Sequence, residues 1–301
     1  MATPFLDTDR RLGRATALIG QDGGRYPHGN SLLVVGADET VLIDPSLSLV
    51  ARGGAPMPVD RMLVSHAHED HLAGVHLHPD ATIQLHEADL LGAHSLEGLL
   101  TVYGMPADIN DTWAETLTRD FHYVARPDAT TFVDGDVIDL GGGVRIEVVH
   151  LAGHTRGHSG FLVPSEGVFF CADIDLSAFG PYYGDHWSDL EDFERSLARC
   201  RDIDARTYVT FHHRGIVEGR ARFLDQLDAF GAVIARREQA LLAYLAEPRT
   251  MDEIVAHRFV YRPGVQLLFA DHVERRSADL HLQRLARTGA VSIDDGLWRA
   301  T

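Results

Sequence analysis

The chain has 301 residues, and 45% of them are hydrophobic, which is ordinary for a globular protein with one large core or a core and a small appended domain. It carries 44 acidic and 27 basic residues, a formal net charge of −17, and every basic residue is arginine. The absence of lysine excludes a lysine Schiff base and a Walker-type phosphate loop, and the negative charge makes nucleic acid a poor partner.

Two further features of the composition concern location and redox state. No segment approaches the roughly eighteen uninterrupted apolar residues of a membrane-spanning helix, and the N-terminal segment lacks the apolar run of a signal peptide. We therefore expect a cytoplasmic protein without a membrane segment. The two cysteines, Cys171 and Cys200, are too few for a disulfide framework.

Short apolar runs bounded by Gly, Asp or Pro predict that the first part of the chain is rich in strands. We expect strands within residues 15–20, 30–36, 39–45, 61–66, 82–87, 131–140, 144–151, 160–164, 167–173 and 206–213. Residues 88–130 lack clear strand patterns and predict a helical cover. A further helix is expected from Ser188, because Glu191 completes a capping-box pattern ahead of apolar residues at helical spacing.

The pattern changes beyond residue 218. Apolar residues at helical spacing within 222–245, a capping-box pattern at Thr250 and Glu253, and a further helical run that ends before Gly289 predict three helices. The Asp-Asp-Gly sequence at 294–296 predicts a hairpin. Because three helices followed by a hairpin are the order of a winged helix, we divide the chain into a first domain, residues 1–218, and a winged-helix-like domain, residues 219–301.

The charge of the C-terminal part argues against DNA binding. Residues 219–301 hold 12 Arg and 11 acidic residues, a net charge of +1, which leaves −18 for residues 1–218. Arg284 and Arg287 could contact phosphate, but their acidic neighbours favour a role in packing, or in a homodimer formed through this domain.

The stretch "HAHEDH" at 66–71 follows a predicted strand and is the strongest chemical signal in the sequence. In extended chain, residues i and i+2 point the same way, so His66 and His68 can bind one ion together. Asp70 and His71 follow where the chain turns into a helix, and they would face a second ion. Neutral imidazole ligands suit zinc or iron. A carboxylate ligand also allows a harder, more Lewis-acidic metal ion to bind.

One loop cannot complete two coordination spheres, so further ligands must come from the ends of other strands. Three stretches offer them: "LAGHTRGHSG" contains His154, "VFFCADID" contains Asp173, and "YVTFHHRG" contains His212 and His213.

With the motifs "HAHEDH", "GHTRGH", "CAD" and "TFHHRG" in this order, residues 15–218 resemble a metallo-β-lactamase-fold hydrolase with a glyoxalase II-like motif set. The resemblance implies an α/β fold, a four-layer αββα sandwich with two metals at one edge between the sheets. It implies that the first metal is bound by His66, His68 and His154, and the second by Asp70, His71 and His212. Asp173 would bridge them, and His213 is the alternative to His212. Asp44, in "LIDPS", would order the loop behind the ligands.

The implied chemistry is hydrolysis by a hydroxide shared between two zinc ions, with iron or manganese as alternatives. Asp70 would orient this nucleophile and carry a proton to the leaving group. Aromatic and histidine side chains after Asp173 are expected to line the substrate pocket, namely Tyr182, Tyr183, His186 and Trp187. An acidic catalytic part with nearby aromatics favours a small-molecule acyl substrate, an ester, thioester or lactone.

Three other functions are compatible with the sequence. A phosphodiesterase or ribonuclease of the same fold would need a basic patch near the metals. A mononuclear iron oxygenase would bind a single iron. A metal-binding regulator would read DNA with its C-terminal domain and keep that activity without metal.

Overall fold

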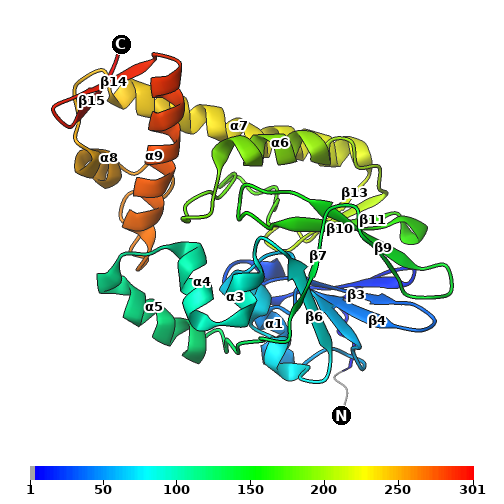
Figure 1. Cartoon of the computed structure of the whole chain (residues 1–301). Coiled ribbons are helices and arrows are strands. Elements are labelled where there is room, and N and C mark those ends of the chain that lie inside the picture. The colour runs from blue at the N-terminus through cyan, green and yellow to red at the C-terminus, as the bar shows by residue number, and fades with distance from the viewer. Residues whose placement is uncertain (1–3) are drawn as a thin grey trace.

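Two β-sheets form the centre of the protein, as the computed structural model, which describes residues 4–301, shows in Figure 1. The first sheet has seven strands in sequential order: β1 (Arg10–Leu12), β2 (Ala15–Leu18), β3 (Ser31–Val35), β4 (Thr40–Ile43), β5 (Arg61–Leu63), β6 (Thr82–His86) and β7 (Thr130–Phe132). The strands β1 to β4 pair antiparallel, and β4 to β7 pair parallel.

The second sheet has six strands, and strands that are neighbours in the sheet are again consecutive in the chain. Its strands are β8 (Val137–Asp139), β9 (Arg145–His150), β10 (Ser159–Val163), β11 (Val168–Ala172), β12 (Thr207–Thr210) and β13 (Ile216–Glu218). All neighbours pair antiparallel except β11 and β12, which are parallel. Each expected strand region contains a strand, and the edge strands β1 and β13 were not predicted.

The alternation of side chains along each strand builds two kinds of core. On β11, Val168 and Phe170 point between the sheets, whereas Phe169 points to the outer helices. On β4, Ile43 faces the other sheet and Leu42 faces the helical side. Both faces of these strands are buried, so apolar side chains on either face stabilise the fold. Each fully buried large side chain contributes roughly 1.5–3 kcal/mol.

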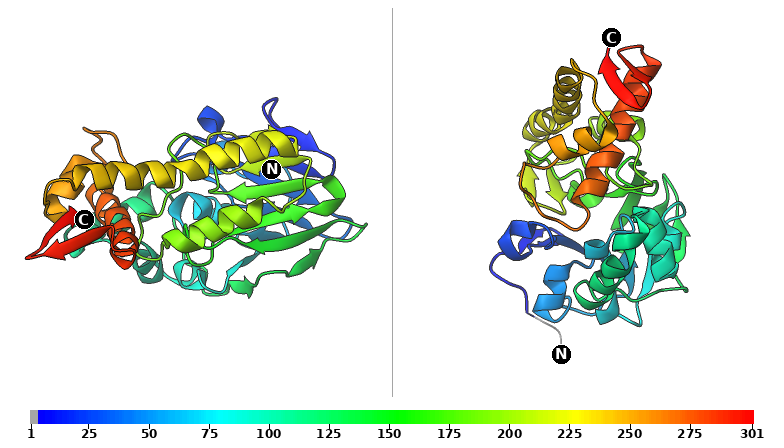
Figure 2. Two further views of the ribbon diagram at one scale, coloured as in Figure 1. Left: turned by 90° about the horizontal axis from the view of Figure 1, so that it is seen from above. Right: turned by 90° about the vertical axis from the view of Figure 1, so that its left-hand side faces the viewer.

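Helices cover the outer face of each sheet. The first sheet is covered by short helices: α1 (Leu47–Arg52), α2 (Glu69–Leu72), α3 (Leu90–His94), α4 (Leu96–Tyr103) and α5 (Ala107–Arg119). The second sheet is covered by α6 (Leu190–Cys200) and α7 (Arg220–Tyr244), which Figure 2 shows lying across it. Three single turns, η1 (Gln21–Gly24), η2 (Val75–Leu77) and η3 (Pro164–Glu166), lie in connections. The αββα order and the helical cover agree with the sequence-based expectation.

Two local expectations need correction. Residues 131–140 are not one strand, because β7 pairs with β6 in the first sheet and β8 pairs with β9 in the second, so the chain crosses between sheets here. The helix α6 is capped by Asp189, whose side chain accepts from the Asp192 N–H. Ser188 instead donates from its hydroxyl to the carbonyl of His154 at 2.7 Å.

The C-terminal part contains α7, α8 (Met251–His257), α9 (Ala270–Arg287) and a hairpin of β14 (Val291–Asp294) and β15 (Leu297–Ala300). The helix α8 begins with the expected capping box of Thr250 and Glu253. The first turns of α7 pack on the second sheet through residues such as Phe223 and Phe230, whereas Leu241 belongs to a separate C-terminal core. The predicted boundary at residue 218 therefore precedes a helix that both parts share.

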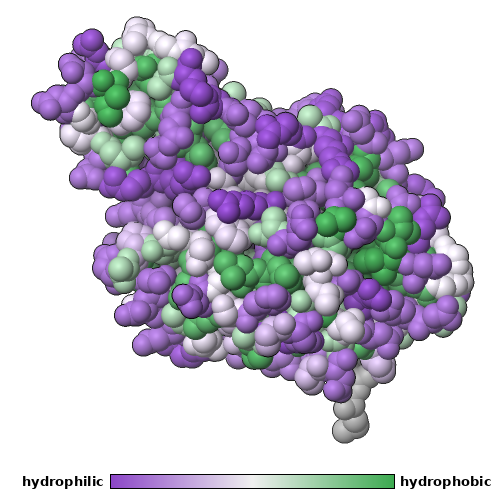
Figure 3. All heavy atoms as spheres, in the orientation of Figure 1, coloured by the Kyte–Doolittle hydropathy of each residue, from purple (hydrophilic) through white to green (hydrophobic). Residues whose placement is uncertain are grey.

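The face seen in Figure 3 is mostly hydrophilic, and the C-terminal part stands out from it as a lobe. Among the described residues, we find no helix with the length and apolar character needed to cross a membrane.

Candidate metal centre

Strand ends and the loops that follow them bring seven candidate ligands to one edge of the two sheets. His66 and His68 follow β5, and Asp70 and His71 lie on α2. His154 lies in the loop between β9 and β10, Asp173 follows β11 directly, and His212 lies two residues beyond β12. The side chains form three overlapping groups able to hold a metal ion: His66 with His68 and His154, His66 with His71 and Asp173, and Asp70 with His71 and His212.

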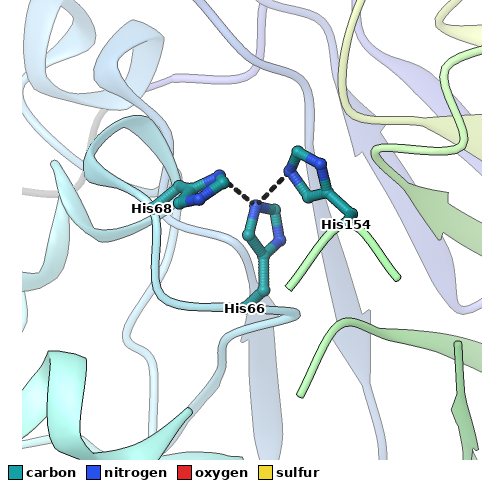
Figure 4. Close-up of side chains that lie close together, drawn as sticks. All are labelled: His66, His68 and His154. Atoms are coloured by element: carbon teal, nitrogen blue, oxygen red, sulfur yellow. Dashed lines mark hydrogen bonds between the residues drawn. The ribbon is translucent and has the colours of Figure 1, made fainter. Parts of the chain in front are cut away.

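In the first group, three imidazole nitrogens converge (Figure 4). His66 Nε2 lies 3.0 Å from His68 Nδ1 and 3.1 Å from His154 Nε2. His154 donates from Nδ1 to the carbonyl of Tyr182 at 2.9 Å, which leaves its Nε2 without a proton when the ring is neutral.

The same reasoning applies to the other two rings. The Ser65 hydroxyl donates to Asp44, so its oxygen accepts from Nδ1 of His66, and Nε2 of His66 carries a lone pair. His68 faces Asp185 through Nε2, at 3.0 Å from Oδ2, and this carboxylate favours the proton on that nitrogen. When the three rings are neutral in these tautomers, their lone pairs face one another, an arrangement that a metal ion satisfies, so the donor set fits a metal ion.

The other two groups combine imidazole and carboxylate. In the group of His66, His71 and Asp173, His71 Nε2 lies 3.1 Å from Asp173 Oδ1. In the group of Asp70, His71 and His212, His212 Nε2 lies 3.0 Å from Asp70 Oδ2. Oδ2 of Asp173 lies 3.3 Å from His154 Nε2, so the two oxygens of this carboxylate face His71 and His154.

Unpartnered buried atoms give a second test of whether a metal fits. Within residues 4–301, Oδ2 of Asp70, Nε2 of His71 and Oδ1 of Asp173 are buried and form no hydrogen bond of normal geometry, although they lie in the charge contacts given above. Burying such polar atoms without partners costs free energy, and buried carboxylates are normally paired or bound to metal. The cluster is therefore suited to divalent cations with nitrogen and oxygen ligands.

The structure distinguishes the two adjacent histidines after β12. His212 is 6% exposed and lies in the cluster, and its Nδ1 donates to the carbonyls of Gly24 and His28. His213 has a φ of 55° and directs its ring toward Asp175, with Nε2 3.6 Å from Oδ2. The alternative ligand, His213, therefore lies outside the cluster.

Asp44 lies behind the candidate ligands and is hydrogen-bonded to His71 and Ser65. It is fully buried and accepts hydrogen bonds from the Ser65 N–H at 2.6 Å, the Ser65 hydroxyl at 2.7 Å and Nδ1 of His71 at 2.8 Å. A carboxylate on the far nitrogen of a ligating histidine fixes the tautomer and strengthens the ligand. His158 has a similar role for Asp173, because its Nδ1 donates to the Leu151 carbonyl and its Nε2 accepts from the Asp173 N–H.

The carboxylates also set the protonation of the metal-free cluster. Burial lowers the pKa of His212, but Asp173 and Asp70 outweigh this effect and raise the pKa to about 9. Burial likewise opposes the charged form of His71, while Asp44, Asp173 and Asp70 raise its pKa well above the ordinary value. Near neutral pH, His212 and His71 of the metal-free cluster are therefore protonated, and they must lose a proton before they can bind a metal ion.

We expect the affinity for Zn²⁺ to rise with pH up to about 9, the pKa of metal-free His212, because each bound metal must displace protons. Competition with a chromophoric chelator of known pH dependence measures this affinity. Calorimetry in buffers of different ionisation enthalpy counts the protons released. The His212→Gln variant should show a shallower pH dependence, and an affinity that does not change with pH would contradict the expectation.

A cavity of about 210 Å³ opens beside the cluster. Its lining includes five of the candidate ligands, namely His68, Asp70, His154, Asp173 and His212. Of the four residues predicted to line the pocket, Tyr182 lies on it.

The other three predicted pocket residues lie elsewhere. Tyr183 is 1% exposed and points into the core under α6, where its hydroxyl contacts Nε2 of His281 at 2.9 Å. His186 and Trp187 extend along α4 with their N–H groups bonded to the carbonyls of Tyr103 and Val102. Alternation explains the difference between Tyr182 and Tyr183, because adjacent side chains of an extended segment point in opposite directions.

Sequence reasoning missed a carboxylate on the cavity wall. Glu69, between His68 and Asp70, is 6% exposed and accepts hydrogen bonds from the hydroxyls of Tyr26, at 2.9 Å, and Tyr103. Burial, followed by the charge of Asp70, raises the pKa of Glu69. The only signal in the sequence was the second acidic residue of "HAHEDH", because the two tyrosines come from distant segments.

Comparison with known proteins agrees with this geometry. A model of the metallo-beta-lactamase superfamily matches residues 25–213. A metallo-beta-lactamase family protein from Thermus thermophilus, TTHA1429, is 24% identical, with a TM-score of 0.69 over 96% of this chain and 99% of that chain. A beta-lactamase domain protein from Burkholderia ambifaria is 19% identical, with a TM-score of 0.69 over 100% of this chain and 97% of that chain.

More distant similarity includes a B3 metallo-beta-lactamase with an active-site glutamic acid, 16% identical, with a TM-score of 0.54 over 78% of this chain and 91% of that chain. No match was found among curated proteins. These structural similarities, at low identity, demonstrate the fold and not a substrate. Because the family model spans well over half of its residues, the chain belongs to the metallo-beta-lactamase superfamily.

Proposed function

We propose that this protein is a dinuclear metal-dependent hydrolase that acts on an ester, thioester or lactone. The observation that carries the proposal is the pair of donor sets joined by Asp173, whose Oδ1 lies 3.1 Å from His71 Nε2 and whose Oδ2 lies 3.3 Å from His154 Nε2. One set would consist of His66, His68 and His154, and the other of Asp70, His71 and His212. Zinc and iron both suit these ligands.

Metals bound there would lower the pKa of a water molecule and polarise the substrate's reactive bond. The protein's own groups would do the rest. Asp70 lies on the cavity wall, where its carboxylate can orient the attacking water and pass a proton to the leaving group. The hydroxyl of Tyr182 donates to Asp185 Oδ1 at 3.3 Å on the same wall, and by turning away from this carboxylate it can donate to a developing oxyanion instead.

The character of the cavity favours a carbonyl substrate. Its lining combines carboxylates with aromatic and apolar side chains, and it includes no arginine among the residues that the structure describes. Phosphodiester substrates are normally held by arginine or lysine, and this chain has no lysine. A ribonuclease or phosphodiesterase therefore has less support.

The arginines of α9 give little support to a DNA-reading regulator. Arg284 pairs with Glu238 and with Glu194 at 2.9 Å, and Arg287 pairs with Glu191. Glu191 and Glu194 lie on α6, so these arginines join the C-terminal part to the catalytic part. A mononuclear iron oxygenase would leave the second donor set without a function.

The proposal predicts that Zn²⁺-loaded protein hydrolyses members of a panel of aryl esters, thioesters and lactones faster than a phosphodiester or single-stranded RNA. Rates should vanish after chelation and return when metal is added back. Metal analysis should give two ions per chain. Preference for the phosphorus substrates would support the phosphodiesterase instead. A single firmly bound iron, or metal-independent DNA binding without turnover, would support the oxygenase or the regulator.

A further inference from the structure

The C-terminal part of the chain reaches the cavity beside the metal cluster. The connection between α8 and α9, residues 258–269, contributes Tyr261, Leu267 and Phe269 to the lining. Figure 1 shows α9 running from the C-terminal lobe down toward α4 and α5. One wall of the cavity, which we call the C-terminal wall and define by these three residues, is therefore built by chain outside the region matched by the family model.

Buried polar contacts hold this wall in place. The carboxylate of Glu274, which is 1% exposed, accepts hydrogen bonds from the N–H groups of Phe259 at 2.8 Å, Val260 at 3.1 Å and Tyr261 at 2.7 Å. A buried carboxylate that binds three successive backbone N–H groups fixes the path of the chain. The backbone of Tyr261 is thus positioned by the buried carboxylate of Glu274.

Aromatic contacts connect the C-terminal wall to the rest of the cavity. Phe269 packs edge-on against Trp113 of α5, with ring centroids 5.4 Å apart. The ring of Tyr261 lies 5.7 Å from that of Phe179. These four aromatic side chains all line the cavity, so the surface that they present is broad and largely apolar.

The charges around the cavity indicate what this surface can bind. Glu69 is already hydrogen-bonded to two tyrosines, and Asp185 faces His68, so these carboxylates have partners. Since no arginine is present among the described residues of the lining, a second anionic group on the acyl chain would find no counter-charge apart from the metal centre itself. The cavity volume, about 210 Å³, exceeds the roughly 150 Å³ that suffices for benzene in an apolar cavity.

We propose that the C-terminal wall of Tyr261, Leu267 and Phe269 binds an uncharged, bulky apolar acyl group, such as a phenylacetyl group, and thereby determines which esters are cleaved. This inference rests on the proposed hydrolase function, and it assigns the C-terminal part a role in substrate selection. An acetyl group is too short to use this surface, so small and bulky esters should respond differently to changes in the wall.

The test compares p-nitrophenyl acetate with p-nitrophenyl phenylacetate, which share a leaving group, on the full-length metal-loaded protein. The Leu267→Ala and Phe269→Ala variants should each lose about tenfold in kcat/KM on the phenylacetyl ester and change less than about twofold on the acetyl ester. Leu268→Ala is the matched control, because Leu267 and Leu268 are each 42% exposed but only Leu267 lines the cavity. This control should leave both rates unchanged.

Charge selectivity is tested in the same way. Acyl chains of similar length that end in a carboxylate or in a trimethylammonium group should be poor substrates. Preference for either charged ester, or equal losses on the acetyl and phenylacetyl esters in Leu267→Ala, would overturn the assignment of the wall.

A binding measurement separates this inference from the proposed function. A non-hydrolysable ketone that carries the same phenyl group should bind about tenfold more weakly to Leu267→Ala than to Leu268→Ala, measured by calorimetry. If no ester is cleaved but the ketone shows this difference, the hydrolase proposal is wrong, and the C-terminal wall is still a binding surface for the apolar group. If esters are cleaved and the ketone binds equally to both variants, the assignment of the acyl group to the C-terminal wall is wrong and the hydrolase proposal stands.

Discussion

Replacement of Asp173 by alanine is expected to abolish turnover and to lower the metal content of the purified protein. Burial opposes ionisation of this carboxyl, but His71 and His212 hold its pKa well below the ordinary value, so it is charged at neutral pH. Its two oxygens face His71 and His154, one from each donor set. Loss of a shared ligand should exceed the roughly 10- to 100-fold effect typical of groups that only support a ligand.

Two measurements on Asp173→Ala are needed together, namely metal per chain by elemental analysis and the rate on the best ester of the panel. The matched control is Asp204→Ala, because the Asp204 side chain is 91% exposed and remote from the cluster. Full activity and full metal content in Asp173→Ala would remove the dinuclear proposal. Circular dichroism should verify that the variant is folded, since a folded but inactive protein isolates the effect on the site.

Replacement of Asp44 by asparagine is expected to weaken metal binding about 10- to 100-fold although Asp44 touches no metal-binding position directly. The carboxylate accepts from His71 and twice from Ser65, which in turn accepts from His66. An amide keeps the shape but removes the charge, and its NH₂ group would face donors. His71 would lose the carboxylate that fixes its tautomer, and the Ser65 hydroxyl, which accepts from His66, would lose the carboxylate to which it donates.

The affinity for Zn²⁺ of Asp44→Asn, measured by chelator competition, tests this expectation. Asp38→Asn is a matched control, because Asp38 is exposed on the loop between β3 and β4. Metal affinity equal to that of the unmodified protein would mean that Asp44 only stabilises the fold. In that case Asp44→Asn should lower the free energy of unfolding of the metal-free protein and leave metal binding unchanged.

Some features of this protein were determined by local sequence. The Thr250 and Glu253 capping box and the hairpin turn at Asp295 and Gly296 depend on residues a few positions apart, and both form as predicted. The strands and their buried faces follow from alternation over a few residues. His66 and His68 share a direction because they are two residues apart beyond a strand, so their convergence was also predictable.

Only the tertiary structure decided the features that join distant segments. His212 enters the cluster because its ring is held by carbonyls of Gly24 and His28, whereas the φ of 55° at His213 turns the next side chain away. Glu69 accepts a hydrogen bond from Tyr26, which lies 43 residues before it in the sequence. The C-terminal wall of the cavity comes from a loop that we had assigned, from the sequence, to the other domain. Short-range periodicity fixes the direction of a side chain within its own element. Which groups it meets depends on how the sheets and helices pack, and that information lies in no short stretch of the chain.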